Sequence, residues 1–183
     1  GAYRYGSYDG RVYIFFNDGS YPTTASSADV ILGGDVGAGS YFGSTILTVD
    51  MNGDGRTDLV VGARGYNTGQ GRLYFYETRE NFAWQIQKQF TASTSPRTGL
   101  GGTGQEIEIV GESASGFGYT VASGDWNADG KTDLAVGAYL YATSTGRAYI
   151  FYNDGTISNG ATSADVIIAG EATSSQFGSA LTA

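Results

Sequence analysis

The chain has 183 residues, a size that allows one domain with a buried core. Its formal net charge is −8, only 15% of its residues are charged, and glycine occurs 30 times but proline twice. This composition argues against a helical bundle, and against nucleic acid or an anionic membrane surface as a partner; it favours short strands joined by glycine turns.

Two residue types are missing from the sequence, and their absence narrows the chemistry. There is no cysteine and no histidine. Disulfides, thiolate-bound zinc and the usual Ser/His/Asp or Cys/His catalytic groups are therefore excluded, and any metal must be bound by oxygen. No run of apolar residues reaches the length of a membrane span, so none is predicted.

The same motifs return along the chain in the same order. Residues 10–19 recur as residues 146–155, and residues 71–76 carry a shorter copy. Phe-Gly pairs at Phe42, Phe117 and Phe177 mark repeat units of roughly 60 residues, the middle one lengthened by an insertion. In chain order, the units are a partial blade (1–41), a blade with an insertion at 78–105 (42–116), a blade (117–176) and the first strand of a further blade (177–183).

Within a unit the pattern is typical of strands. In the middle unit, we expect strands at 45–49, 58–62, 72–76 and 106–110, because these runs are rich in β-branched and aromatic residues and are separated by glycine turns. The prediction is an all-β fold of about three four-stranded antiparallel β-propeller blades. A β-sandwich is the alternative, but the fixed strand order in every repeat favours the propeller.

Three blades are too few to close a ring. We therefore expect the blades to be part of a larger propeller, with further blades supplied by the same parent chain or by another copy of it.

Two nine-residue loops carry the pattern Asp-x-Asn-x-Asp-Gly-x-x-Asp. Side-chain oxygens at positions 1, 3, 5 and 9 come from Asp50, Asn52, Asp54 and Asp58 in the first loop, and from Asp125, Asn127, Asp129 and Asp133 in the second. Calcium prefers six to eight such hard oxygen ligands. The glycine at position 6 permits a sharp turn, which leaves the main-chain carbonyl of Arg56 or Lys131 at position 7 as a further ligand. The sequence thus predicts two Ca²⁺ sites.

Two other interpretations of these loops are weaker. An EF-hand needs a glutamate at position 12 and flanking helices, whereas position 12 is Val61 or Val136 and the flanks are typical of strands. A plain Asn-Gly or Asp-Gly turn would not require four oxygens in the same positions twice.

Taken together, these motifs resemble the FG-GAP repeats of the integrin α-subunit propeller. The resemblance rests on Phe42-Gly43, the loop 50–58, Gly62-Ala63 and Gly71-Arg72, and on the equivalent residues from Phe117 to Tyr149. It implies a propeller with calcium in the first hairpin of a blade, an extracellular or cell-surface setting, and a non-enzymatic role in adhesion, ligand binding or assembly. The family's proline after Gly-Ala is replaced here by Tyr3, Arg64 and Tyr139.

Aromatic residues follow the Gly-Ala pairs, on loops that the resemblance places opposite the calcium hairpins. Tyr5, Tyr66, Tyr139 and Tyr141 are candidates for a protein- or glycan-binding surface. The alternative is that these rings pack between blades.

Two other functions remain as alternatives. One is a lectin that uses the aromatic loops. The other is a carboxylate-dependent hydrolase, for which the carboxylates outside the loops include Glu106, Glu108, Glu112 and Glu171; Glu112 and Glu171 are expected at surface turns.

Overall fold

The computed structural model of the chain describes residues 1–19, 22–34, 39–78 and 107–183, and their strands form three antiparallel sheets. The first sheet pairs β1 (Arg11–Ile14) with β2 (Val30–Gly33). The second contains β3 (Phe42–Val49), β4 (Asp58–Ala63), β5 (Arg72–Tyr76) and β6 (Ile107–Val110), and the third contains β7 (Thr120–Gly124), β8 (Asp133–Ala138), β9 (Arg147–Phe151) and β10 (Val166–Ala169). The insertion predicted at 78–105 lies outside the described residues except for Thr78.

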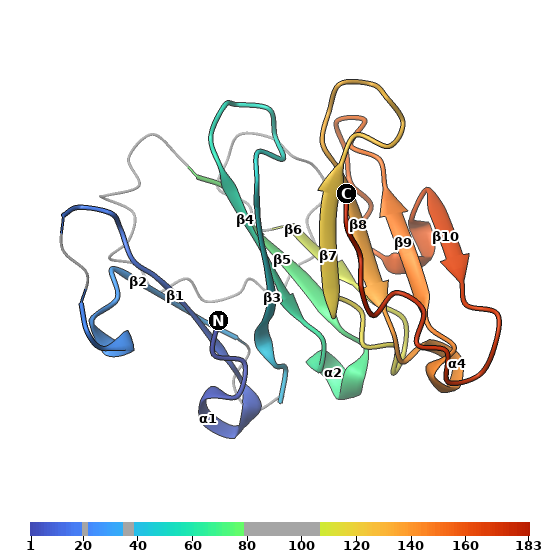
Figure 1. Cartoon of the computed structure of the whole chain (residues 1–183), viewed down its shortest axis with the longest axis horizontal. Helices are drawn as coiled ribbons and strands as arrows, with labels where there is room; N and C mark the ends of the chain where they lie inside the picture. Colours follow the sequence, from blue (N-terminus) through green and yellow to red (C-terminus); the bar gives the residue numbers. More distant parts are fainter. Residues whose placement is uncertain (20–21, 35–38, 79–106) are drawn as a thin grey trace.

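Each four-stranded sheet follows the order of the chain, and short turns recur at equivalent places. The turns α1 (Tyr5–Tyr8), α2 (Tyr66–Gly69) and α4 (Tyr141–Ser144) precede β1, β5 and β9, and the 3₁₀ turns at Ala25–Ser27 and Ala161–Ser163 precede β2 and β10. Figure 1 shows the sheets side by side, with the β3–β4 and β7–β8 hairpins at one end and the three α turns at the other.

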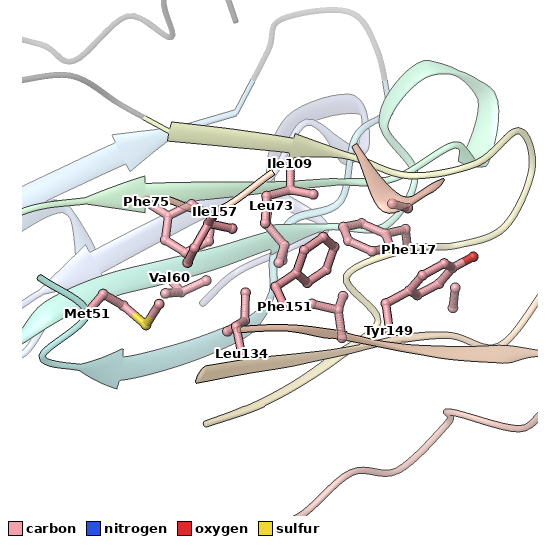
Figure 2. Close-up of a cluster of buried hydrophobic side chains, with 13 residues drawn as sticks. Met51, Val60, Leu73, Phe75, Ile109, Phe117, Leu134, Tyr149, Phe151 and Ile157 are labelled. Carbon is pink, nitrogen blue, oxygen red and sulfur yellow. The ribbon is translucent and has the colours of Figure 1, made fainter. Parts of the chain in front are cut away.

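The second sheet buries both of its faces. Successive side chains in a strand point to opposite faces, so Val60 of β4 lies in the core shared with the third sheet, whereas Val61 lies in the core shared with the first. In β5, Leu73 and Tyr74 divide between the two cores in the same way. Figure 2 shows the larger core, where side chains from the second and third sheets interdigitate. Burial on both faces explains why these strands are nearly continuous apolar runs.

The recurring Gly-Arg and Phe-Gly motifs meet at the junction between sheets. Gly71 forms a parallel bridge with Phe117, and Gly10 does so with Phe42. Gly71 has a left-handed φ of 83°, and a Cβ there would collide with the carbonyl oxygen of Phe117, so only glycine fits. Phe117 is fully buried and meets the ring of Tyr149 edge-on, with ring centroids 5.4 Å apart.

The first strands of neighbouring sheets, β3 and β7, lie against each other, and the later strands extend away from this line (Figure 1). Successive sheets built from consecutive strands and stacked face to face are blades of a β-propeller rather than the two sheets of a sandwich. The predicted all-β propeller fold is therefore confirmed. Among the described residues, no helix has both the length and the apolarity needed to cross a membrane.

Candidate functional site

The two predicted metal loops are the hairpin loops between β3 and β4 and between β7 and β8 (Figure 1). Val49 pairs with Asp58 at the base of the first hairpin, and Gly124 pairs with Asp133 at the base of the second. Loop position 1 therefore directly follows one strand, and position 9 begins the next. Strands on both sides distinguish these loops from an EF-hand, which is flanked by helices.

The first loop curls around its first carboxylate. One oxygen of Asp50 accepts a hydrogen bond from the N–H of Asp54 at 3.2 Å, and the other accepts one from Gly55 at 2.9 Å. The side-chain oxygen of Asn52 accepts a second bond from the Asp54 N–H at 3.0 Å, and Asp54 accepts one from the N–H of Arg56 at 2.9 Å. Positions 1, 3 and 5 thus turn their oxygens toward the inside of the loop.

The second loop repeats these four hydrogen bonds at equivalent positions, and the loops differ in one further bond each, from Gly53 to Asp50 in the first and from Asn127 to Asp133 in the second. Asp125 accepts hydrogen bonds from the N–H groups of Asp129 and Gly130 at 3.0 and 2.9 Å. Asn127 accepts one from Asp129 at 3.0 Å, and Asp129 accepts one from Lys131 at 2.8 Å. The loops differ at positions 2, 4 and 7 and share the residues at the other six positions, so the shared residues determine the conformation.

The position-9 carboxylates are buried beneath the loops. Asp58 accepts hydrogen bonds from the N–H groups of Met51 at 3.2 Å and Thr78 at 2.8 Å. Asp133 is fully buried and accepts equivalent bonds from Trp126 and Asn153, both at 2.9 Å. Each carboxylate therefore connects the start of its loop to the residues that follow the third strand of the same sheet.

The electrostatics of the first loop favour a cation. Burial raises the pKa of Asp58 above its usual value, and the negative charges of Asp54 and Asp50 raise it further, although the N–H groups of Thr78 and Met51 oppose this shift. The ionised form of Asp58 is thus disfavoured by its surroundings. A divalent ion near Asp50, Asp54 and Asp58 would offset the repulsion between their negative charges.

The residues fit a calcium ion in donor type and in order around the loop. All the predicted side-chain donors are hard carboxylate or amide oxygens, which are the ligands calcium prefers. Over the described part of the chain, no three carboxylate side chains gather about a single point as a metal cluster. The loops instead satisfy these oxygens with their own backbone N–H groups.

Three of the predicted surface tyrosines are each covered by an arginine. The pairs are Tyr5 with Arg11, Tyr66 with Arg72 and Tyr141 with Arg147, and the guanidinium carbons lie 3.8, 3.6 and 3.7 Å from the ring centroids. Each arginine belongs to a Gly-Arg motif and each tyrosine to the α turn before it. The structure therefore places these three rings in separate stacks, one for each sheet, and does not bring them together.

The fourth candidate, Tyr139, lies in a different group. Its ring is 4.2 Å from that of Tyr119, and its hydroxyl accepts a hydrogen bond from Nη1 of Arg64 at 3.4 Å. Sequence reasoning named neither Tyr119 nor Arg64 as a site residue. The available signal was that Arg64 stands where the other two repeats carry Tyr3 and Tyr139.

The carboxylates considered for catalysis serve as partners of arginines. Glu108 is buried and lies 3.0 Å from Arg72, and Glu112 accepts hydrogen bonds from Arg147 and Tyr149, both at 2.7 Å. Glu112 does begin a turn, since its carbonyl accepts a hydrogen bond from the N–H of Ser115 at 3.2 Å, but its side chain is less exposed than expected because it is partly buried in this network. Glu171 is exposed, and Glu106 lies outside the described residues.

The sheets and hairpin loops define a class of protein, tandem propeller repeats with an Asp-rich loop in the first hairpin. Comparison with protein families matches the FG-GAP repeat at residues 42–76 and 117–151, which span the first three strands of the second and third sheets. The chain therefore contains two FG-GAP repeats, which confirms the resemblance.

Curated relatives place these repeats among integrin alpha-like sequences. The chain is 32% identical to integrin alpha-4 of Xenopus laevis over 78% of its length, 36% identical to integrin alpha-3 of Mus musculus over 68%, and 38% identical to integrin alpha-11 of Homo sapiens over 62%. It spans only 12%, 10% and 9% of those proteins. The chain is thus an integrin alpha-like FG-GAP module, about a tenth of the length of these relatives.

Proposed function

We propose that the chain is a calcium-stabilised, extracellular β-propeller module that binds rather than catalyses, with a role in adhesion, ligand binding or assembly. The observation that carries this proposal is the pair of hairpin loops with the same oxygen positions and a shared set of hydrogen bonds to the Asp, Asn and Asp of positions 1, 3 and 5. A loop conformation that recurs with different intervening residues indicates a common requirement, and a hard cation supplies one.

Each ion would be bound by one loop. The first set of ligands is Asp50, Asn52, Asp54, the main-chain carbonyl of Arg56, and Asp58; the second is Asp125, Asn127, Asp129, the carbonyl of Lys131, and Asp133. The role of the ion is structural, because it neutralises the clustered carboxylates and holds the hairpin closed.

The loops are connected to the core, so fixing them stabilises the blades. Met51, at position 2 of the first loop, is buried in the core between the second and third sheets (Figure 2). Asp58 accepts a hydrogen bond from the N–H of Thr78, which follows the end of β5. Calcium bound at the hairpin would therefore stabilise both the sheet that carries the loop and its packing against the next sheet.

Melting curves with calcium and with a chelator test the proposal. An ion that binds only the folded state at a hundredfold excess over its Kd stabilises by about 2.7 kcal/mol per site, and each kcal/mol moves Tm by about 2–4 °C in a protein of this size. We expect the chelator to lower Tm, and Asp50→Ala and Asp125→Ala each to remove part of the calcium response.

Glu171→Ala is the matched control for these variants. It removes one negative charge from an exposed position outside both loops. Its calcium response should equal that of the parent chain. A Tm that does not change with chelator would exclude structural calcium.

The extracellular setting and the partners belong to the same proposal. Weak calcium loops are filled at the millimolar calcium levels found outside cells. Large apolar side chains remain exposed on the outer sheets, namely Ile31 at 37%, Ile167 at 41% and Ile168 at 43%. We expect further blades, from the same parent chain or from another copy, to pack there, and native mass spectrometry with and without calcium would detect association between copies.

A further inference from the structure

A group of tyrosines surrounds one arginine at the end of the blades opposite the calcium hairpins. The guanidinium carbon of Arg64 lies 4.5 Å from the ring centroid of Tyr41, 5.7 Å from that of Tyr119 and 6.0 Å from that of Tyr3. Its Nη1 also donates to the hydroxyl of Tyr139. Tyr8 extends the group, since its ring centroid is 5.3 Å from that of Tyr41. We call Tyr3, Tyr8, Tyr41, Arg64, Tyr119 and Tyr139 the tyrosine–arginine cluster.

The cluster is assembled from all three blades. Tyr3 precedes the α1 turn and Tyr8 is its last residue. Tyr41 and Arg64 adjoin the ends of β3 and β4, and Tyr119 and Tyr139 adjoin the ends of β7 and β8. It lies at the end of the molecule where Figure 1 shows the α turns, so it is remote from both hairpin loops.

The charge of Arg64 has no carboxylate partner. In the described ranges no Asp or Glu lies within ion-pair distance of Arg64, and its one hydrogen bond, to Tyr139, is long at 3.4 Å. The arginines of the neighbouring stacks differ, because Arg72 and Arg147 pair with Glu108 and Glu112. A guanidinium has five donors in a fixed fork that matches a carboxylate. Arg64 is partly exposed, and apart from Nη1 its guanidinium donors have no hydrogen bond to a described residue.

Two of the tyrosines occupy strained backbone positions. Tyr8 and Tyr41 have left-handed φ values of 67° and 54°, which are rare for bulky residues and cost roughly 1 kcal/mol each. The backbone is left-handed at these positions in every blade, where the equivalent residues are Gly69 and Ser144 for Tyr8, and Gly116 and Gln176 for Tyr41. The left-handed conformation therefore belongs to the repeat, and what distinguishes Tyr8 and Tyr41 is that large aromatic rings occupy these positions in the first blade and at its junction with the second.

We propose that the tyrosine–arginine cluster binds an acidic sugar, with the carboxylate on Arg64 and the apolar face of the sugar ring on Tyr8 and Tyr3. The exposed ring of Tyr8, 48% accessible, offers a stacking face beside Tyr41, the ring on which Arg64 lies. Exposed Arg4, 5.5 Å from the centroid of Tyr3, adds a second positive charge in an otherwise acidic chain. These side chains offer ring faces and cationic donors but no run of backbone groups, which suits a compact ring better than an extended peptide.

Calorimetric titration with methyl glucuronide tests the proposal, and its methyl ester is the matched probe that lacks only the charge. We expect saturable binding of the glucuronide that weakens with salt, and little binding of the ester. Arg64→Gln should lower affinity by about tenfold or more, because it removes a charge-assisted, bidentate contact. Arg11→Gln, which alters an arginine stacked on Tyr5 outside the cluster, should leave affinity unchanged.

Tyr8→Gly separates binding from folding. Because it removes a stacking ring but relieves a left-handed tyrosine, we expect Tm to stay level or rise while affinity falls about fivefold. Equal binding of the ester, tighter binding of an oligoglutamate peptide, or no saturable binding would overturn the proposal. The proposal would also be overturned if glucuronide binding were lost in Asp125→Ala and retained in Arg64→Gln, since that result would place the sugar at a hairpin loop. The cluster is tested independently of calcium, so the failure of one proposal leaves the other intact.

Discussion

At the scale of single residues, the same motif contributes differently to the free energy of unfolding in different surroundings. Phe117 and Phe177 both begin a Phe-Gly pair that bridges to the glycine of a Gly-Arg motif. Phe117 is fully buried in the core of Figure 2, whereas Phe177 remains 39% exposed. The motif therefore fixes the local backbone, while the free energy contributed by the ring depends on the neighbouring sheet.

Substitution of these two rings should separate the contributions. We expect Phe117→Ala to lower the free energy of unfolding by about 3–5 kcal/mol, because it opens a cavity in a packed core. Phe177→Ala should cost roughly 1–2 kcal/mol, since part of that ring is already solvated. Urea denaturation measures both values, and equal losses would show that the core around Phe117 does not have the packing described.

The ionisation of a single residue, Tyr149, makes the stability of the fold depend on pH. Burial and the hydrogen bond to Glu112 raise the pKa of Tyr149 above its usual value. The folded state therefore favours the neutral phenol, and its contribution to stability is full below the unfolded-state pKa of about 10 and is lost as the pH rises toward the higher folded-state value.

We expect stability to fall above about pH 10, and Tyr149→Phe to make that fall shallower because it removes this ionisation. At neutral pH the variant should cost about 1 kcal/mol, since Glu112 keeps its pairing with Arg147. Tyr152→Phe, outside the network, is the control. Denaturant midpoints measured from neutral to alkaline pH give the answer, and parallel curves for Tyr149→Phe and the parent would contradict it.

At the scale of elements, the loop after β9 links the two Asp-rich hairpins, β3–β4 and β7–β8. The Asn153 side chain donates to the carbonyl of Met51 at 2.6 Å, and its backbone N–H donates to Asp133 at 2.9 Å. Met51 belongs to the first Asp-rich loop and Asp133 to the second. Asn153 is buried, whereas its counterpart in the first repeat, Asn17, is exposed.

Asn153→Ala should therefore destabilise the chain by about 1–3 kcal/mol, because it leaves the buried Met51 carbonyl without its donor. Asn17→Ala should change stability by less than about 0.5 kcal/mol, as is usual for an exposed site. Thermal melts of the two variants make a direct comparison. If both lose the same stability, the link between the sheets is not energetically significant.

At the scale of the whole molecule, the dominant property is negative charge. Eighteen acidic residues outnumber ten basic ones, and six of the acidic residues lie in the two hairpin loops. Self-repulsion should make the calcium-free chain sensitive to ionic strength. The effect of calcium bound at the loops can nevertheless be distinguished from the general screening of charge by salt.

At matched ionic strength, we expect calcium to raise Tm well beyond the increase given by sodium chloride, because screening acts on all charges weakly whereas ligation acts at two sites strongly. In an Asp50→Ala/Asp125→Ala double variant, calcium and sodium should become equivalent. Differential scanning calorimetry measures the effect, and identical curves for the two salts in the parent chain would contradict site-specific binding.

The sequence by itself determined the features that depend on local geometry. The spacing of Asp, Asn and Gly in loops 50–58 and 125–133 predicts a curled hairpin, because each side chain bonds to backbone N–H groups two to five residues away. Glycine and aromatic repeats likewise predicted the blades, since strand pairing within a blade is between consecutive segments.

Only the tertiary structure decided which side chains from different blades meet. The tyrosine–arginine cluster joins residues more than a hundred positions apart, from Tyr3 to Tyr139, and no local spacing encodes that proximity. Tertiary packing also separated Tyr5, Tyr66 and Tyr141 into arginine stacks and partly buried the side chain of Glu112, which was expected at the surface, in a network with Arg147. Contacts between blades depend on how entire sheets stack, and that is fixed by the apolar faces that neighbouring sheets bury against each other rather than by any one segment.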